Sequence, residues 1–265
     1  MSTATSAPAT DRVSIAGVEL EVLRRGAGQP LLLLHGFQHL DPGLPLLEML
    51  ARNASLIAPS HPGFGGSKRP ADFGTVYDLV HLYLEFLDTL PKDAPVTLMG
   101  LSFGGWLAAE IAVKAGRRID RLILVDALGI KISDRETPDI LDLFNTHPDE
   151  VVRKSWHDPA QFAPRFDDME DDALVTRSRN WETLCRYGFH PYMHNPQLKR
   201  WLGNIKARTL VLWGASDGVV KPAYGEAYAK LIPGARFETL AGAGHHPEIE
   251  QPAALAARVQ AFLQQ

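Results

Sequence analysis

The chain has 265 residues, of which 45% are hydrophobic and 22% are charged, and its formal net charge at pH 7 is −4. This composition is typical of a globular chain, and the mild acidity argues against nucleic acid and anionic membranes as partners, because both favour a basic face. The single cysteine, Cys185, excludes an intrachain disulfide and the four-cysteine zinc frameworks.

Residues 1–10 lack the basic start and apolar middle of a secretory signal, and they are predicted to be a disordered tail instead. No apolar run approaches the roughly 18 residues that a membrane span needs. We therefore expect a cytoplasmic protein with no nucleic-acid or membrane partner. Whether it forms a homodimer stays open.

An alternation of strands and helices is predicted along most of the chain. Two short strands flank Ala16 and Gly17 and indicate an N-terminal hairpin. Continuous apolar runs, typical of strands buried on both faces of a parallel sheet, then alternate with helical patterns, which predicts an α/β fold. The hairpin strands are 13–15 and 18–23, the later runs are 31–34, 56–58, 96–99, 122–125, 210–213 and 237–240, and the helical patterns are 76–90, 106–113 and 255–262.

Residues 128–203 break this alternation because they contain no strand candidate. Helical patterns occur there around 140–144 and 171–187. So long a stretch without strands indicates an insertion or a second domain, and its many aromatic residues are unlike a linker. We interpret it as a helical cap on a core formed by 11–127 and 204–265.

A G-x-S-x-G pattern surrounds Ser102 between a predicted strand and a predicted helix. A nucleophile at such a sharp turn needs neighbours without side chains two residues away on either side, and Gly100 and Gly104 provide them. The helix that starts near Phe103 would also direct its N-terminal amides toward the reacting oxygen.

The serine needs a base, and His245 is the preferred one of ten histidines. It follows the last predicted strand across a glycine-containing loop, which can carry an imidazole over the edge of the sheet. The adjacent His246 is expected to point elsewhere. Since no His-x-x-x-His pair lies with a carboxylate on one helix, no metal site is predicted.

The base needs an orienting carboxylate, and Asp217 is the preferred acid. It leaves the predicted strand 210–213 in a loop, and the chain order Ser102, Asp217, His245 is the one expected of the serine elbow. Asp126, at the end of the strand 122–125, is the alternative.

Two backbone amides are predicted to stabilise the oxyanion, those of Phe103 and of Phe37. Phe37 follows the predicted strand 31–34, and Gly36 would let this loop approach the substrate closely. His35 is expected to hold the loop through ring hydrogen bonds.

Together these residues resemble the α/β-hydrolase superfamily, in particular its capped serine hydrolases, such as carboxylesterases and hydrolases of meta-cleavage products. The resemblance covers nearly the whole chain except the tail and the cap. It implies an α/β-hydrolase fold with an eight-stranded, mostly parallel sheet and an inserted helical cap, and an enzyme without a cofactor. The segments that carry it are LLLLHGF, PSHPGFGGSKRP, GLSFGG, LVLWGASDGVV and GAGHHPEIEQP.

The resemblance implies hydrolysis of a carboxylic ester or lactone of a small, largely apolar substrate through an acyl-enzyme. A carbon–carbon hydrolase of meta-cleavage type is one alternative, although His246 stands where such enzymes usually carry a tryptophan. A hydrolase-like receptor with little turnover is another. Candidate substrate-binding residues are His35, Gly36, Trp106, Trp156, Trp181, Tyr192 and His246.

Overall fold

The computed structural model of this protein describes residues 10–265, so the predicted tail lies outside the described residues except for its last one. That residue, Thr10, begins strand β1 (Thr10–Ile15), which forms the predicted hairpin with β2 (Val18–Arg25). Ile15 pairs with Val18 across the turn at Ala16 and Gly17, as the sequence predicts.

The remaining strands are β3 (Pro30–Leu34), β4 (Ser55–Pro59), β5 (Val96–Leu101), β6 (Ile119–Val125), β7 (Arg208–Gly214) and β8 (Arg236–Leu240). The helices are α1 (Pro45–Ala51), α2 (Val76–Asp88), α3 (Phe103–Ala115), α4 (Pro148–Ser155), α5 (Pro159–Phe162), α6 (Asp171–Gly188), α7 (Leu198–Trp201), α8 (Pro222–Lys230), α9 (Pro247–Glu250) and α10 (Pro252–Leu263).

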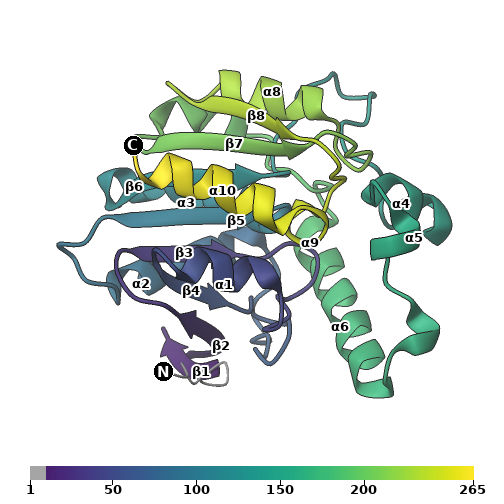
Figure 1. Cartoon of the computed structure of the whole chain (residues 1–265), viewed down its shortest axis with the longest axis horizontal. Coiled ribbons are helices and arrows are strands. Elements are labelled where there is room, and N and C mark those ends of the chain that lie inside the picture. The colour runs from purple at the N-terminus through teal and green to yellow at the C-terminus, as the bar shows by residue number, and fades with distance from the viewer. Residues whose placement is uncertain (1–9) are drawn as a thin grey trace, which may run out of the picture.

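The core of the fold is one eight-stranded sheet with the strand order β1-β2-β4-β3-β5-β6-β7-β8 (Figure 1). The two pairings made by β2 are antiparallel, and the pairings from β4 to β8 are all parallel. This is the expected α/β-hydrolase fold. Because the parallel strands end at one edge of the sheet, the loops that follow them gather there.

Helices cover both faces of the sheet, which explains the unbroken apolar runs. In β3, Leu32 and Leu34 pack into the core on the face of α2, α3 and α8, whereas Leu31 and Leu33 pack against α1 and α10 on the other. Figure 1 shows α1 and α10 lying side by side in front of the strands. None of the helices within residues 10–265 combines the length and the apolar character needed to cross a membrane.

Four α-helices, α4 to α7, occupy the chain between β6 and β7, and Figure 1 shows α4, α5 and α6 gathered at one end of the sheet. The predicted helix at 171–187 is present as α6. The prediction of a helix around residues 140–144 is wrong. The side chain of Asp142 accepts the amides of Phe144 and Asn145, and the hydroxyl of Tyr192 bonds the backbone of Leu141 and Leu143, so these groups replace helical hydrogen bonds.

Candidate active site

Ser102 lies at the sharp turn between β5 and α3, with φ 49° and ψ −112°. This is an unfavourable backbone region for a residue with a side chain, and it is held by the packing around it. A β-carbon on Gly100 would collide with the Gly104 carbonyl, and one on Gly104 would collide with the Leu34 carbonyl. The two glycines therefore allow α3 to start directly against β3 and β5.

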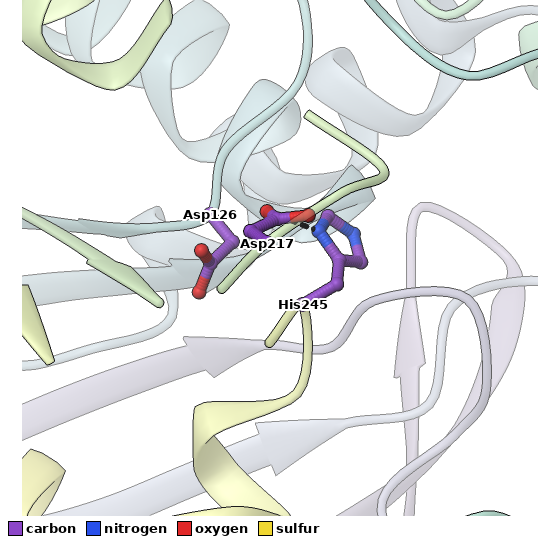
Figure 2. Close-up of side chains that lie close together, drawn as sticks. All are labelled: Asp126, Asp217 and His245. Carbon is purple, nitrogen blue, oxygen red and sulfur yellow. Dashed lines mark hydrogen bonds and ion pairs between the residues drawn. The ribbon is translucent and has the colours of Figure 1, made fainter. Parts of the chain in front are cut away.

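The structure brings Ser102, His245 and Asp217 into one hydrogen-bonded chain. The Oγ atom of Ser102 lies 2.8 Å from Nε2 of His245, and Nδ1 of His245 lies 2.7 Å from Oδ2 of Asp217. Figure 2 shows the imidazole and the Asp217 carboxylate facing each other. Ser102 is 4% exposed and His245 is 2% exposed, so this chain is shielded from solvent.

The two candidate acids have different partners. Oδ1 of Asp217 accepts the amides of Val219 and Val220 at 2.8 and 3.0 Å, which leaves its Oδ2 for His245. Asp126 instead accepts the amide of Gly214 through Oδ1 at 2.8 Å and makes no hydrogen bond to the histidine. Burial, and secondly the charge of Asp217, raise the pKa of Asp126 well above its usual range.

The backbone of the His245 loop is held by residues that the sequence interpretation missed. The amide of His245 donates to the carbonyl of Ser155, at the end of α4, at 2.7 Å. The buried Glu250 accepts the amide of Gly244 at 2.6 Å and those of His157 and Asp158 at 2.8 and 3.1 Å. An acidic residue within the PEIEQP segment gives no sequence signal for this role, because most of its partners are distant backbone groups.

The loop after β3 lies directly beside the serine. A β-carbon on Gly36 would come within 3.2 Å of the Ser102 Cβ. The amide of Phe37 donates no hydrogen bond to any residue in the described part of the chain, and the same is true of the amide of Phe103. Both candidate oxyanion donors are therefore free to bind an incoming oxygen.

Two buried histidines support this loop. Nε2 of His35 accepts the amide of His61, Nε2 of His61 bonds the carbonyl of His35, and Nδ1 of His61 bonds the hydroxyl of Tyr83. Nδ1 of His35 bonds the carbonyl of Gly36 at 3.1 Å. Burial lowers the pKa of His61 to about 3 and that of His35 well below its usual value, the latter with a second contribution from His61. Both ring nitrogens of His35 contact backbone, as expected of a residue that holds the loop.

Aromatic rings surround the candidate catalytic histidine. The Phe37 ring centroid lies 5.1 Å from that of His245 and 6.4 Å from that of Trp181. Trp156 stacks on His246 with a centroid distance of 4.4 Å, and the His246 ring lies edge-on to His245 at 5.5 Å. Four of the predicted substrate-binding or oxyanion residues therefore form one cluster at His245.

Two further residues predicted to bind substrate, Tyr192 and Trp106, lie outside this cluster. Tyr192 packs on Phe144, which itself contacts Trp181, and its hydroxyl is used by backbone groups. Trp106 is buried in the first turn of α3, with its ring edge-on to Phe103 at 5.9 Å.

Helix α6 is fastened to the loops beside the site through three polar side chains. Asn180, which is fully buried, accepts the amide of Gly65 and bonds the side chains of Gln38 and His39. Thr183 donates to the carbonyl of Gly63, and Tyr187 donates to the carbonyl of Pro62. The helical pattern predicted α6 but not these contacts, since polar residues on a helix are usually exposed.

Within residues 10–265, one buried group offers three potential metal ligands close together. These are Asp126, Asp217 and His245, whose ligand atoms lie within 4.8 Å of one another. Both ring nitrogens of His245 and both carboxylate oxygens of Asp217 already have hydrogen-bond partners. We therefore interpret the group as suited to proton transfer rather than to metal binding.

A nucleophile elbow at the end of a central parallel strand, with a histidine and an acid on later loops, defines the α/β hydrolases. The model of the alpha/beta hydrolase family matches residues 31–258, and the chain belongs to this family. Its membership confirms the family resemblance and the fold predicted from the sequence.

Two similar relatives are hydrolases by name. The chain is 28% identical to a 2-hydroxymuconate semialdehyde hydrolase of Pseudomonas sp. strain CF600, over 94% of this chain and 91% of the relative. It is also 28% identical to a 2-hydroxy-6-oxo-2,4-heptadienoate hydrolase of Pseudomonas putida, over 95% of each protein.

Similar solved structures include both carbon–carbon and ester hydrolases. A meta-cleavage product hydrolase from Pseudomonas fluorescens IP01 matches with a TM-score of 0.77 and 21% identity, over 96% of this chain and 97% of the other. Naproxen esterase from Bacillus subtilis matches with a TM-score of 0.75 and 17% identity, over 97% and 92%. These two likenesses establish the shared fold.

Proposed function

We propose that the protein is a serine hydrolase in which Ser102 is the nucleophile, His245 the general base and Asp217 the acid that orients it. The observation that carries this proposal is the unbroken chain of hydrogen bonds from Ser102 through His245 to Asp217, at 2.8 and 2.7 Å. Membership of the hydrolase family supports it.

The positions of the protons on His245 and Ser102 determine the proposed mechanism. Nδ1–H of His245 donates to Asp217, so Nε2 accepts the Ser102 hydroxyl proton as the serine oxygen attacks a carbonyl carbon. The amides of Phe37 and Phe103 stabilise the tetrahedral oxyanion, each worth about 3 kcal/mol. The histidine then protonates the leaving group and activates the water that hydrolyses the acyl-enzyme.

We propose an uncharged carboxylic ester or lactone as the substrate class. The side chains around His245 are aromatic, which favours an apolar acyl or alkyl group. The arginines of α6 are engaged away from this cluster: Arg177 lies over Phe166, Arg179 bonds the Gly65 carbonyl and Arg186 bonds Glu182. A buried carboxylate on the substrate would need such a cation.

Cleavage of a carbon–carbon bond in a meta-cleavage product is the second candidate. The relatives named for 2-hydroxymuconate semialdehyde and 2-hydroxy-6-oxo-2,4-heptadienoate favour it. The same nucleophile and base would serve, because both reactions include attack on a carbonyl carbon. The difference lies in the leaving group and in the anionic end of a dienoate, which the pocket would have to bind.

A parallel assay tests the proposal. The chain would be given p-nitrophenyl esters of two to eight carbons and a 2-hydroxy-6-oxo-dienoate, with Ser102→Ala as the matched background. We expect ester turnover that Ser102→Ala abolishes, and fluorophosphonate labelling on the Ser102 peptide. Turnover of the dienoate that is faster than that of every ester would favour carbon–carbon hydrolysis over ester hydrolysis. Ester turnover that persists in Ser102→Ala would overturn the nucleophile.

A further inference from the structure

Asp126 is a buried acid that the proposed mechanism does not use. It follows β6 directly, is 1% exposed and has a left-handed backbone with φ 45°, which is costly for a residue with a side chain. Its Oδ1 accepts the Gly214 amide, and its Oδ2 is buried with no partner among the described residues. Figure 2 shows it beside Asp217, on the side away from the imidazole.

The distance between the two acids limits their combined charge. One ligand atom from each of Asp126, Asp217 and His245 fits within 4.8 Å, and all three residues are buried. Two carboxylates this close and this buried oppose each other's ionisation, which favours a state in which the pair holds one proton.

The hydrogen bonds decide which acid carries that proton. Asp217 accepts three N–H groups, from Val219, Val220 and His245, and donors of this kind favour the anion. Asp126 accepts only the Gly214 amide, and its second oxygen is bare. Protonation of Asp126 therefore disturbs fewer of the hydrogen bonds that stabilise a carboxylate than protonation of Asp217 does.

We propose that Asp126 is a positioning residue that works as a neutral carboxylic acid. It anchors Gly214, from which the Asp217 loop departs, while leaving Asp217 as the only anion next to His245. The inference rests on the proposed triad, since it assigns Asp126 a role relative to that histidine. The other ionisable groups that face it are Asp217, His245 and, from α9, Glu248.

The dependence of stability on pH follows from this role. The pKa of Asp126 is raised in the folded protein, mainly by burial and then by Asp217, whereas in the unfolded chain an aspartate titrates near 3.9. Above about pH 4 the unfolded chain releases this proton and the folded protein keeps it. Stability contributed at this position therefore falls as the pH rises, until the pH reaches the raised pKa.

Urea unfolding of the wild type and of Asp126→Asn from pH 5 to 8 tests this directly. An asparagine resembles the neutral acid, with one acceptor oxygen and one donor, and does not titrate. We expect the folding constant of the wild type, relative to the variant, to fall about tenfold per pH unit. Asp88→Asn, an exposed aspartate at the end of α2, is the control and should give a flat ratio. A flat ratio for Asp126→Asn as well would overturn the proposal.

The pH–rate profile separates an electrostatic role from a purely structural one. If Asp126 is neutral, Asp126→Asn does not shift the pH at the midpoint of the acid limb of the kcat/KM profile, even where it changes the maximal kcat/KM. If Asp126 were ionised, removing an anion this close to His245 would move that midpoint down by more than about one pH unit. Such a shift would refute the proposal that Asp126 is neutral. The variant Asp126→Ala should lower the free energy of unfolding without changing the pH of this midpoint.

A third measurement needs no variant and no substrate. Carboxyl ¹³C NMR of aspartate-labelled wild-type protein should show one side-chain carboxyl that stays protonated at neutral pH. Ionisation of every aspartate carboxyl at pH 7 would overturn the proposal even where Asp126→Asn fails to fold. Neither unfolding nor NMR requires turnover. A protein without hydrolase activity would therefore contradict the proposed function, while the protonation state of Asp126 could still be measured.

Discussion

The Nε2 atom of His35 accepts the backbone amide of His61 at 2.9 Å, and the ring of His61 in turn bonds the carbonyl of His35 at 3.0 Å. This exchange requires that His35 carries its proton on Nδ1 and His61 on Nε2, so that Nδ1 of His61 accepts the Tyr83 hydroxyl. The loop that carries Phe37 is therefore joined to the loop after β4 by two uncharged rings.

Replacing His61 by glutamine should flatten part of the acid dependence of stability. The pKa of His61 in the folded protein is lowered to about 3. Below about pH 6.5, His61 therefore binds a proton in the unfolded chain but not in the folded protein. Wild-type stability should lose about 1.4 kcal/mol per pH unit at this position as the pH falls from 6.5. Urea unfolding between pH 4.5 and 7.5 measures it.

The glutamine variant should begin about 1–3 kcal/mol less stable at pH 7, because buried partners lose hydrogen bonds. The gap to the wild type should then narrow as the pH falls. His147→Gln, at a side chain that is 75% exposed, is the matched control. A gap that stays constant from pH 7.5 to 4.5 would mean that His61 is not held neutral.

Asp217→Asn should lower kcat about 10⁴-fold for whichever carbonyl substrate the protein hydrolyses. An asparagine can still accept the Val219 and Val220 amides through Oδ1, but its NH₂ group then faces His245 and favours the tautomer with the proton on Nε2. Steady-state kinetics at pH 7 measure the loss. A loss of less than tenfold would place the orienting acid elsewhere.

Glu250→Gln should loosen the His245 loop. The carboxylate accepts the amides of Gly244, His157 and Asp158, and a glutamine would present N–H groups to at least one of these donors. We expect a loss of about 2–3 kcal/mol of stability and a lower kcat. Urea unfolding and ester kinetics measure both.

The control for this change is Glu226→Gln, which removes an exposed ion pair to Lys230 that should contribute less than about 1 kcal/mol. Equal stability of the Glu250 and Glu226 variants would show that the three amides at Glu250 find other acceptors.

Asn180→Ala should release α6 from the loops beside the site. It deletes the bonds to Gly65, Gln38 and His39 and leaves these partly buried groups without that partner. Hydrogen exchange should rise in residues 171–188, while the sheet keeps its protection. Ser178→Ala, on the exposed side of the same helix, is the control, and equal exchange in both variants would contradict the predicted role of Asn180.

The strands and the serine elbow could be predicted because their signals are local. The run from Val96 to Met99 ends at Gly100, and the steric demand of the turn at Ser102 appears directly as two glycines. The structure also brings together the three residues predicted for the triad, since parallel strands deliver their loops to one edge.

The supporting residues could not be predicted because their partners are distant in sequence. Glu250 binds amides 92 and 93 residues away, and Asn180 bonds side chains 141 and 142 residues away. The helix expected at 140–144 failed for the same reason, since Tyr192 takes up the backbone groups that a helix would have used. Side-chain capture of backbone groups leaves no periodic pattern.

The near-complete burial of Ser102 has a kinetic consequence. With 4% of the surface of this residue exposed, approach of an ester to the hydroxyl should depend on an excursion of the chain that widens access to it. Capture of substrate is then slower than diffusional encounter in proportion to the rarity of that excursion. A viscous solvent should slow capture of fast substrates far more than that of slow ones.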